Sequence, residues 1–314
     1  MHPKTGQAKD AGEVGEMKYT NRIIKRITLV VALAITCVIF TNRIYAQETA
    51  TLQQESDDPL ATASREQELP GVKTVDIVLF VGQSNMAGCG GNAALAPAVP
   101  NDVGYEFRPL TDPSGLHPIV EPFGRGDGGY ISDPAPVKNG SMVSSFVNTY
   151  YGATGVPVVA VSASRGATDS AYWASTNVKS ELLNRYTLTK SFLQANHITV
   201  RRAFAIFLQG ESDALEKTTT LQYQTNITAA FEPLFISGLE RVYVITPGHA
   251  KGNILVYDPI VQAQIDLCGR DSRFTLASTS LRSMSDAYMS DEVHYGQQAL
   301  NMIGAEVANV AASN

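Results

Sequence analysis

Residues 75–88 read VDIVLFVGQSNMAG, a nearly continuous apolar run that ends at a glycine and is followed by short polar side chains. A short run of this kind, rich in β-branched residues, is typical of a strand that helices cover on both faces. Ser84 stands two residues beyond Gly82, where the apolar run ends. Its hydroxyl is therefore expected at the carboxyl edge of a sheet, the edge at which open α/β folds bind ligands.

The rest of the chain repeats this pattern, because apolar runs alternate with stretches of helical spacing. The further predicted strands are residues 156–161, 202–208, 241–246 and 274–278. The predicted helices are residues 142–152, 178–195, 219–235, 257–267 and 297–311. Alternation of strand and helix predicts a parallel sheet with right-handed crossovers. The fold class is therefore α/β, with helices on both faces of the sheet.

Residues 88–140 interrupt this rhythm with many Gly, Pro, Asp and Asn residues and little periodicity. A loop of this length inside a compact domain is usually functional or disordered, and this one starts at the carboxyl edge of the predicted sheet. It contains Arg125-Gly126-Asp127, which matches an integrin-type tripeptide. Because short motifs match by chance, we interpret these residues as part of a Gly-rich loop near the ligand-binding edge.

The N-terminus has the pattern of a targeting segment rather than of a folded domain. Basic residues precede an apolar run at residues 27–40, and Ala46 offers a small residue for cleavage. That run is shorter than the roughly 20 residues of a membrane span. We therefore expect a cleaved signal peptide within residues 1–46, with an uncleaved membrane anchor as the alternative. Residues 47–72 are predicted to be a flexible polar linker, which leaves residues 73–314 as one domain.

The charge balance of the chain is acidic. Its formal net charge is -6, from 24 Lys and Arg residues and 30 Asp and Glu residues. Seven of the basic and three of the acidic residues lie in the first 46 positions, so the remainder carries 17 basic and 27 acidic residues. Such a surface repels nucleic acid and anionic membranes. We expect no nucleic-acid partner, and no stable membrane association unless the N-terminal segment is retained. The N-terminal targeting segment predicts that the protein is exported, either to the periplasm or out of the cell, with membrane anchoring as the alternative.

Ser84 has two interpretations. A serine just beyond a buried strand can act as a nucleophile, because backbone N–H groups in the following turn can stabilise developing negative charge. A serine in the same position can equally cap the N-terminus of a helix. The Gly-x-Ser pattern alone does not decide between them, because short motifs have many false positives.

Asp291 and His294 lie in a turn before the last predicted helix. Their side chains can converge, so that the carboxylate holds one imidazole nitrogen while the other nitrogen faces a nucleophile. Alternatively, Asp291 caps the helix and His294 lies in its first turn.

Residues 207–213 read FLQGESD and bring several polar side chains to the carboxyl end of the third predicted strand. The side chain of Gln209 can donate an N–H to an oxyanion. Glu211 and Asp213 can support neighbouring groups or cap the following helix. The chain shows no metal-ligand spacing and no Gly-rich phosphate loop, so we expect neither a metal nor an organic cofactor.

Together these segments resemble the SGNH hydrolase superfamily, and within it the sialate O-acetylesterase/acetylxylan esterase family of carbohydrate esterases. Residues 82–86 (GQSNM) resemble the family's nucleophile block, and residues 209–213 (QGESD) its central block. The sequence Asp291-x-x-His294 resembles the terminal block. The resemblance covers about residues 74–312.

A fourth block of the family, usually a Ser/Ala-Gly-Gly-Thr segment, is matched less well. Residues 164–168 read SRGAT, so Ala167 stands where a second glycine is usual. This departure puts the oxyanion geometry at Gly166 in doubt.

The resemblance implies a three-layer α/β/α sandwich with a five-stranded parallel sheet and a serine esterase mechanism. Ser84 attacks the ester, His294 takes and returns the proton, and Asp291 orients His294. The implied oxyanion donors are the backbone N–H groups of Ser84 and Gly166 and the side chain of Gln209. No metal and no cofactor are implied.

Further residues of the matched blocks are expected to support the site or to contact substrate. They are Gln83, Asn85, Glu211, Arg165 and Trp173. A tryptophan offers a face on which sugars stack, although Trp173 could equally be half-buried and Arg165 an ordinary surface residue.

The function implied by the resemblance is removal of O-acetyl groups from an acetylated carbohydrate. Acetylxylan-type polysaccharide is favoured, because the single-domain length is similar to that of the compact acetylxylan-type members. The alternatives are a sialate O-acetylesterase, a broad short-chain esterase and a non-catalytic carbohydrate-binding protein on the same fold. The joint presence of Ser84, Asp291 and His294 argues against the last.

Overall fold

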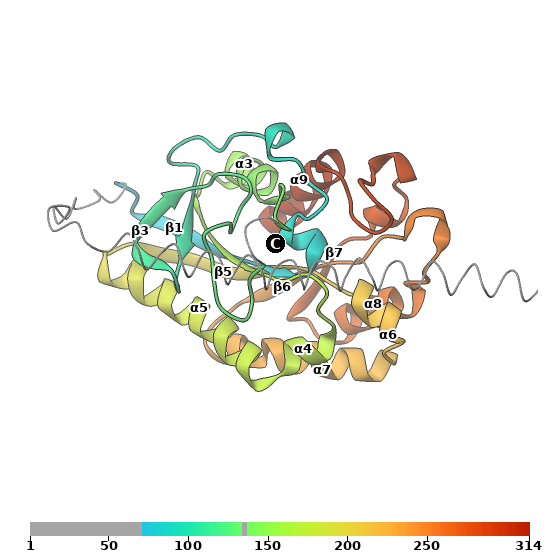
Figure 1. The fold of residues 1–314 in the computed structure, drawn as a ribbon. Coiled ribbons are helices and arrows are strands. Elements are labelled where there is room, and N and C mark those ends of the chain that lie inside the picture. Colours follow the sequence, from blue (N-terminus) through green and yellow to red (C-terminus); the bar gives the residue numbers. More distant parts are fainter. Residues whose placement is uncertain (1–70, 134–136) are drawn as a thin grey trace, which may run out of the picture. The chain divides into compact units, whose positions relative to one another are not determined.

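The computed structural model of the protein describes residues 71–133 and 137–314 (Figure 1). The signal peptide or anchor predicted within residues 1–46, and the predicted linker as far as residue 70, lie outside the described residues. Within the described ranges, no helix is both long enough and apolar enough to cross a membrane.

The described residues form a seven-stranded sheet with the strand order β3-β2-β4-β1-β5-β6-β7. Its strands are β1 (Thr74–Gly82), β2 (Gly104–Arg108), β3 (Asp112–Pro118), β4 (Val158–Ser164), β5 (Thr199–Leu208), β6 (Arg241–Ile245) and β7 (Phe274–Ser278). Neighbouring strands are parallel except for β2 and β3, which form an antiparallel pair. The predicted α/β class is confirmed, and the five predicted strands correspond to β1, β4, β5, β6 and β7.

Strands β2 and β3 correct the prediction that residues 88–140 form one loop. Tyr105 of β2 pairs with Val159 of β4, so the sheet continues beyond the five predicted strands. Tyr105 and Phe107 are buried, but β2 has only 5 residues and also contains Glu106. Strand β3 begins with Asp-Pro-Ser-Gly, a turn-like sequence that an edge strand tolerates. Both strands lack the apolar run by which the others were recognised.

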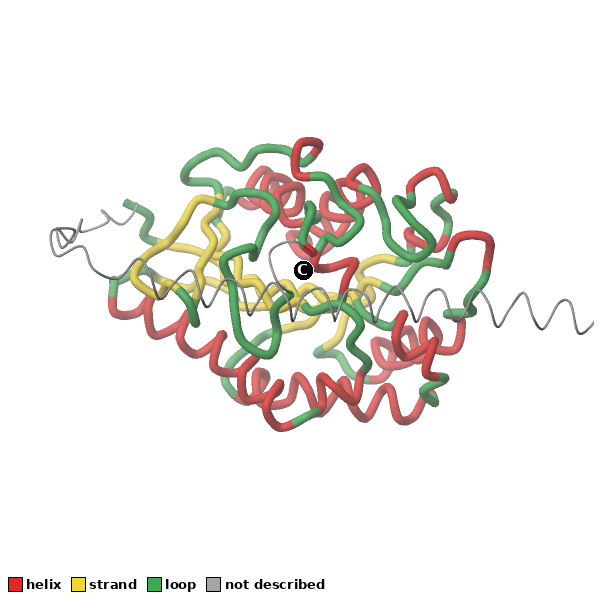
Figure 2. Tube along the Cα trace, viewed as in Figure 1, coloured by secondary structure: helices red, strands yellow, loops and turns green. Residues whose placement is uncertain are grey.

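Helices cover both faces of the sheet (Figures 1 and 2). The long helices are α3 (Val143–Thr154) and α9 (Gln297–Ser313) on one face, and α5 (Thr176–Ala195), α7 (Thr220–Ile236) and α8 (Asp258–Arg270) on the other. The short helices are α2 (Ser84–Ala87), α4 (Ser170–Ala174) and α6 (Glu211–Glu216). Successive side chains of β1 enter opposite cores, Val78 and Phe80 with α3 and α9, and Ile77 and Leu79 with α5 and α7. This alternation is the period-2 geometry of a strand buried on both faces.

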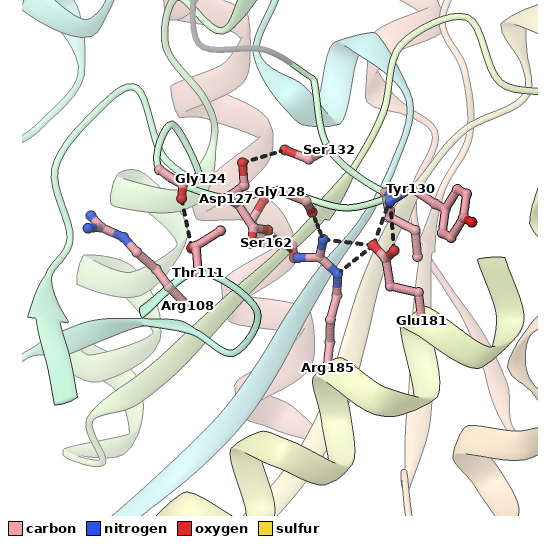
Figure 3. A network of polar contacts seen from close by, with 12 residues as sticks. Arg108, Thr111, Gly124, Asp127, Gly128, Tyr130, Ser132, Ser162, Glu181 and Arg185 are labelled. Carbon is pink, nitrogen blue, oxygen red and sulfur yellow. Dashed lines mark hydrogen bonds and ion pairs between the residues drawn. The ribbon is translucent and has the colours of Figure 1, made fainter. Parts of the chain in front are cut away.

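The loop after β3 is anchored to α5 by a buried arginine (Figure 3). Arg185 donates hydrogen bonds to the Asp127 carboxylate and to the carbonyl oxygens of Gly128 and Ser162. Glu181 accepts from Arg185 and from two backbone N–H groups of the loop. Asp127 is therefore a buried ion-pair partner, which explains the Arg-Gly-Asp tripeptide as part of the folded loop.

Replacing Arg185 by methionine should lower the free energy of unfolding by about 3–5 kcal/mol, because two carboxylates would stay buried without their partner. Urea denaturation followed by circular dichroism measures the difference. The control is Arg282→Met, which removes an exposed pair with Asp258 and should cost less than about 1 kcal/mol. Equal losses in the two variants would contradict the importance of the buried network.

Candidate active site

The carboxyl ends of three neighbouring strands meet at one point of the sheet edge. Gly82, the last residue of β1, pairs with Ser164 at the end of β4 and with Leu208 at the end of β5. An ideal Cβ on Gly82 would lie 2.0 Å from the Leu208 carbonyl oxygen, so only glycine permits this approach. The residues that follow these strand ends are Gln83-Ser84, Arg165-Gly166 and Gln209-Gly210. The fold thus gathers three of the sequence blocks at one edge.

Ser84 is the first residue of α2 and is partly exposed, whereas Gln83, Asn85 and Met86 around it are buried. The cap position of α2 is occupied by Gln83, so Ser84 is not the cap residue of that helix. Ser84 is therefore the partly exposed residue of this short segment, and a nucleophile has to be accessible to substrate.

The segment after α2 packs tightly against the turn that carries His294. An ideal Cβ on Gly90 would lie 2.7 Å from the His294 Cβ and 2.5 Å from the Tyr295 carbonyl oxygen. Real Cβ atoms do not approach so closely, so this position requires glycine. The close packing joins the Asp291–His294 block to the strand ends that carry the other three blocks.

Asp291 holds both the turn and the imidazole of His294. Its Oδ1 accepts from the backbone N–H groups of Val293 and His294, each at 2.8 Å. Its Oδ2 lies 2.7 Å from His294 Nδ1. Burial raises the pKa of Asp291, but the hydrogen bonds from His294 and Val293 outweigh burial and lower the pKa to about 2. The cap of α9 is Gly296, so Asp291 does not cap that helix.

Asn85 links the short helix α2, which begins at Ser84, to both neighbours of His294. Its Oδ1 accepts from the Tyr295 backbone N–H at 3.0 Å, and its Nδ2 donates to the Val293 carbonyl oxygen at 3.2 Å. The same amide donates to Glu211 Oε1 at 2.7 Å. Because Asn85 directly follows Ser84, one side chain fixes the position of the His294 turn relative to Ser84.

Replacing Asn85 by alanine should lower kcat for ester hydrolysis by about 10²-fold while changing KM little, because a misplacement of about 1 Å between reacting groups costs that much. Steady-state kinetics with an aryl acetate separates the two constants. Asn148→Ala is the matched control, since it removes one exposed hydrogen bond, from the Asn148 side-chain amide to the Ala98 carbonyl oxygen. An unchanged kcat in Asn85→Ala would refute this positioning role.

Gln83 and Glu211 support the main chain of the site. Gln83 Oε1 accepts from the backbone N–H groups of Gly210 and Ser212, at 3.3 and 3.4 Å. Glu211 is buried, and burial raises its pKa while the hydrogen bond from Asn85 opposes that shift. Its Oε2 has no hydrogen-bond partner among the described residues. Both side chains are buried, which suits support of the site better than contact with substrate.

Gly166 lies directly beside Ser84, since an ideal Cβ on Gly166 would be 3.4 Å from the Ser84 Cβ. Its backbone N–H donates to Asp133 Oδ2 at 2.7 Å. The next residue, Ala167, has φ +55°, in the left-handed region that favours glycine. This conformation explains why a second glycine is usual here, and alanine adopts it at a cost of about 1 kcal/mol. The sequence did not reveal Asp133, because nothing distinguishes it from the other acidic residues of its loop.

Gln209 has a different role from the one predicted. Its amide Nε2 donates to the Thr168 carbonyl oxygen at 3.0 Å and to Asp213 Oδ2 at 2.6 Å. Its Oε1 accepts from the Tyr223 hydroxyl at 3.0 Å. Both amide hydrogens are used, and the side chain is fully buried, so the predicted donation to an oxyanion is wrong in this arrangement. Gln209 instead links the end of β5 to the segment after β4.

Of the two residues predicted to contact substrate, Trp173 is buried and Arg165 is partly exposed. Trp173 is 1% exposed, and its Nε1 donates to the Thr168 hydroxyl at 3.1 Å, so it offers no face for sugar stacking. Arg165 is partly exposed and donates to the Tyr130 carbonyl oxygen at 2.9 Å. Its guanidinium lies 5.8 Å from the ring centre of Tyr172. Tyr130, whose carbonyl oxygen binds Arg165, is 54% exposed, and the sequence did not single it out.

Within residues 71–133 and 137–314, no group of three or more His, Cys, Asp and Glu side chains is arranged to hold a metal ion.

Several solved structures have a similar fold. A protein from Arabidopsis thaliana superposes with a TM-score of 0.55 at 18% identity, covering 76% of this chain and 98% of that one. NanS gives 0.48 at 12% identity, covering 78% and 98%. Axe2, an acetylxylan esterase from Geobacillus stearothermophilus, gives 0.44 at 13% identity, covering 77% and 96%.

The sequence itself matches a protein family over most of its length. The profile described as carbohydrate esterase, sialic acid-specific acetylesterase (SASA), matches residues 74–313. No curated protein matches the sequence. The chain belongs to this SASA family of carbohydrate esterases and is a carboxylic ester hydrolase.

Proposed function

We propose that the enzyme is a serine esterase that removes O-acetyl groups from a neutral polysaccharide of the acetylxylan type. The observation that carries this proposal is the Asp291–His294 pair, joined at 2.7 Å and held against the helix of Ser84 by Asn85. A hydroxyl, an imidazole and an orienting carboxylate are the groups that acyl transfer through a covalent intermediate requires.

In the proposed reaction, Ser84 Oγ attacks the ester carbonyl carbon while His294 Nε2 takes the hydroxyl proton. Asp291 accepts from Nδ1–H and stabilises the imidazolium. The backbone N–H groups of Ser84 and Gly166 hold the oxyanion. The sugar leaves as an alcohol with the proton from His294, and acetyl-Ser84 remains. Water then attacks this ester as His294 removes its proton, and His294 passes that proton to the leaving Ser84 Oγ, which releases acetate and regenerates the Ser84 hydroxyl.

Charge near the site supports a neutral ester over an anionic sugar. The carboxylates of Asp133, Glu211 and Asp291 all lie near His294, whose charge lowers the pKa of each of the three. A sialic acid carries its own carboxylate, and like charges brought close together disfavour binding. Arg165 supplies a partly exposed cation at the same place, which makes O-acetyl sialic acid the second candidate substrate.

Acetate release from three substrates tests the proposal. The substrates are acetylxylan, O-acetyl sialic acid and a simple aryl acetate. The proposal predicts the highest kcat/KM for carbohydrate on acetylxylan. Faster release from O-acetyl sialic acid would transfer the assignment to the second candidate, and no release from any of the three would overturn the esterase proposal.

The proposed location is outside the cytoplasm, secreted or periplasmic, because basic residues precede the apolar residues 27–40. Retention of that segment as a membrane anchor is the alternative. N-terminal sequencing of the protein from its native host separates the two, since export with cleavage predicts a new N-terminus near residue 47.

A further inference from the structure

The Asp133 side chain ends in a carboxylate on a methylene carbon, the same group as an acetate ion. Its Oδ2 accepts the Gly166 backbone N–H at 2.7 Å, and Gly166 lies beside Ser84. An acyl group bound for attack by Ser84 would place its carbonyl oxygen near this N–H. The carboxylate of Asp133 therefore stands where that oxygen would be held.

Several positive groups surround the Asp133 carboxylate. Burial raises the pKa of Asp133 and outweighs the Gly166 N–H, Lys138, Arg165 and His294, which all act in the opposite direction. These groups belong to different segments of the chain, and each of them offsets part of the cost of burying the Asp133 carboxylate beside Gly166.

Asp133 reaches this position from a fixed part of the loop. Ser132 pairs with Ser164, the last residue of β4, and its hydroxyl donates to the Asp127 carbonyl oxygen (Figure 3). The Asp127 carboxylate is bound in turn by the buried Arg185. The main chain next to Asp133 is therefore held on both the sheet and α5.

We infer that the Gly166 N–H beside Ser84 is a binding position for a small carboxylate or acyl oxygen, and that the Asp133 side chain occupies it in the resting enzyme. The link to catalysis rests on the proposed function, whereas the binding position itself does not. Substrate or free acetate has to displace Asp133 before it can occupy the position. The apparent affinity for substrate or acetate is then the intrinsic affinity multiplied by the fraction of molecules in which Asp133 has left the position.

Acetate binding tests the inference without turnover. The experiment measures binding of sodium acetate, by titration with NMR detection, to Ser84→Ala and to the double variant Ser84→Ala/Asp133→Ala. We expect acetate to bind the double variant at least about tenfold more tightly, because the position is then open. Equal affinities would overturn the inference, whatever the esterase assays show.

Steady-state kinetics of variants that keep Ser84 give an independent test. Asp133→Ala should raise kcat/KM for an aryl acetate by about 3–30-fold and should make free acetate a stronger competitive inhibitor. The control is Asp266→Asn, an acid on α8 that accepts from Gln262 far from this site, and it should change neither constant. A more than tenfold loss of kcat/KM in Asp133→Ala, with an unchanged melting temperature, would show that Asp133 assists the reaction and would overturn the inference.

Discussion

Replacing Ser84 by alanine is expected to lower kcat for acetate release by about 10⁴–10⁶-fold, because the acyl-enzyme route then has no nucleophile. Ser84 is the partly exposed residue at the end of β1, among buried neighbours. Hydrolysis of an aryl acetate, followed by absorbance of the released phenol, measures the loss over several decades.

The control for this prediction is Ser114→Ala, which removes an exposed serine bonded to Asp112 in β3. It should leave kcat within about twofold of the parent, since surface substitutions of this kind rarely change the folded state. If Ser84→Ala retained the parent activity, another residue would have to be the nucleophile.

Replacing Asp291 by asparagine should lower kcat by about 10⁴-fold, because an amide can hold the imidazole in the wrong tautomer. The Oδ2–Nδ1 distance of 2.7 Å requires a hydrogen on Nδ1, which leaves Nε2 free to accept the proton of the nucleophile. Asp286→Asn is the matched control, since Asp286 forms a second carboxylate–imidazole pair with His249 at 2.9 Å. A loss of similar size in both variants would contradict the specific role of Asp291.

The same carboxylate predicts how stability depends on pH. The pKa of Asp291 is about 2 in the folded protein, against an ordinary value of 3.8. A pKa lowered by folding adds stability above the unfolded-state value, and that stability is lost as the pH falls through the folded-state value. The parent should therefore exceed Asp291→Asn in free energy of unfolding above about pH 4, and the difference should shrink towards about pH 2. Urea titrations across this range would contradict the assignment if the difference stayed constant.

The parts of the fold that the sequence predicted are those with strong local patterns. β1 has eight buried residues in succession, and such runs are recognisable without any knowledge of their partners. β2 and β3 are short, and their polar residues resemble those of turns, so their pairing depends on the edge of a sheet that forms elsewhere. Strands β2 and β3 form because the rest of the sheet offers an edge, and the periodicity of their own residues does not predict them.

The site shows the same division between local and tertiary information. Ser84, Asp291 and His294 lie in short motifs that can be recognised from the adjacent residues alone. The direction of the Gln209 amide depends on Thr168, Asp213 and Tyr223, which come from three other segments. The burial of Trp173 and the contact of Asp133 with Gly166 likewise arise only when distant segments pack together.

If Ser84 is a nucleophile activated by His294, a fluorophosphonate should label it covalently. Intact-mass measurement and peptide mapping locate the label. We expect one adduct per chain, on the peptide that contains Ser84, and slow or absent labelling in the His294→Ala variant. An adduct on a different serine, or an unlabelled protein that still hydrolyses acetyl esters, would contradict the claim.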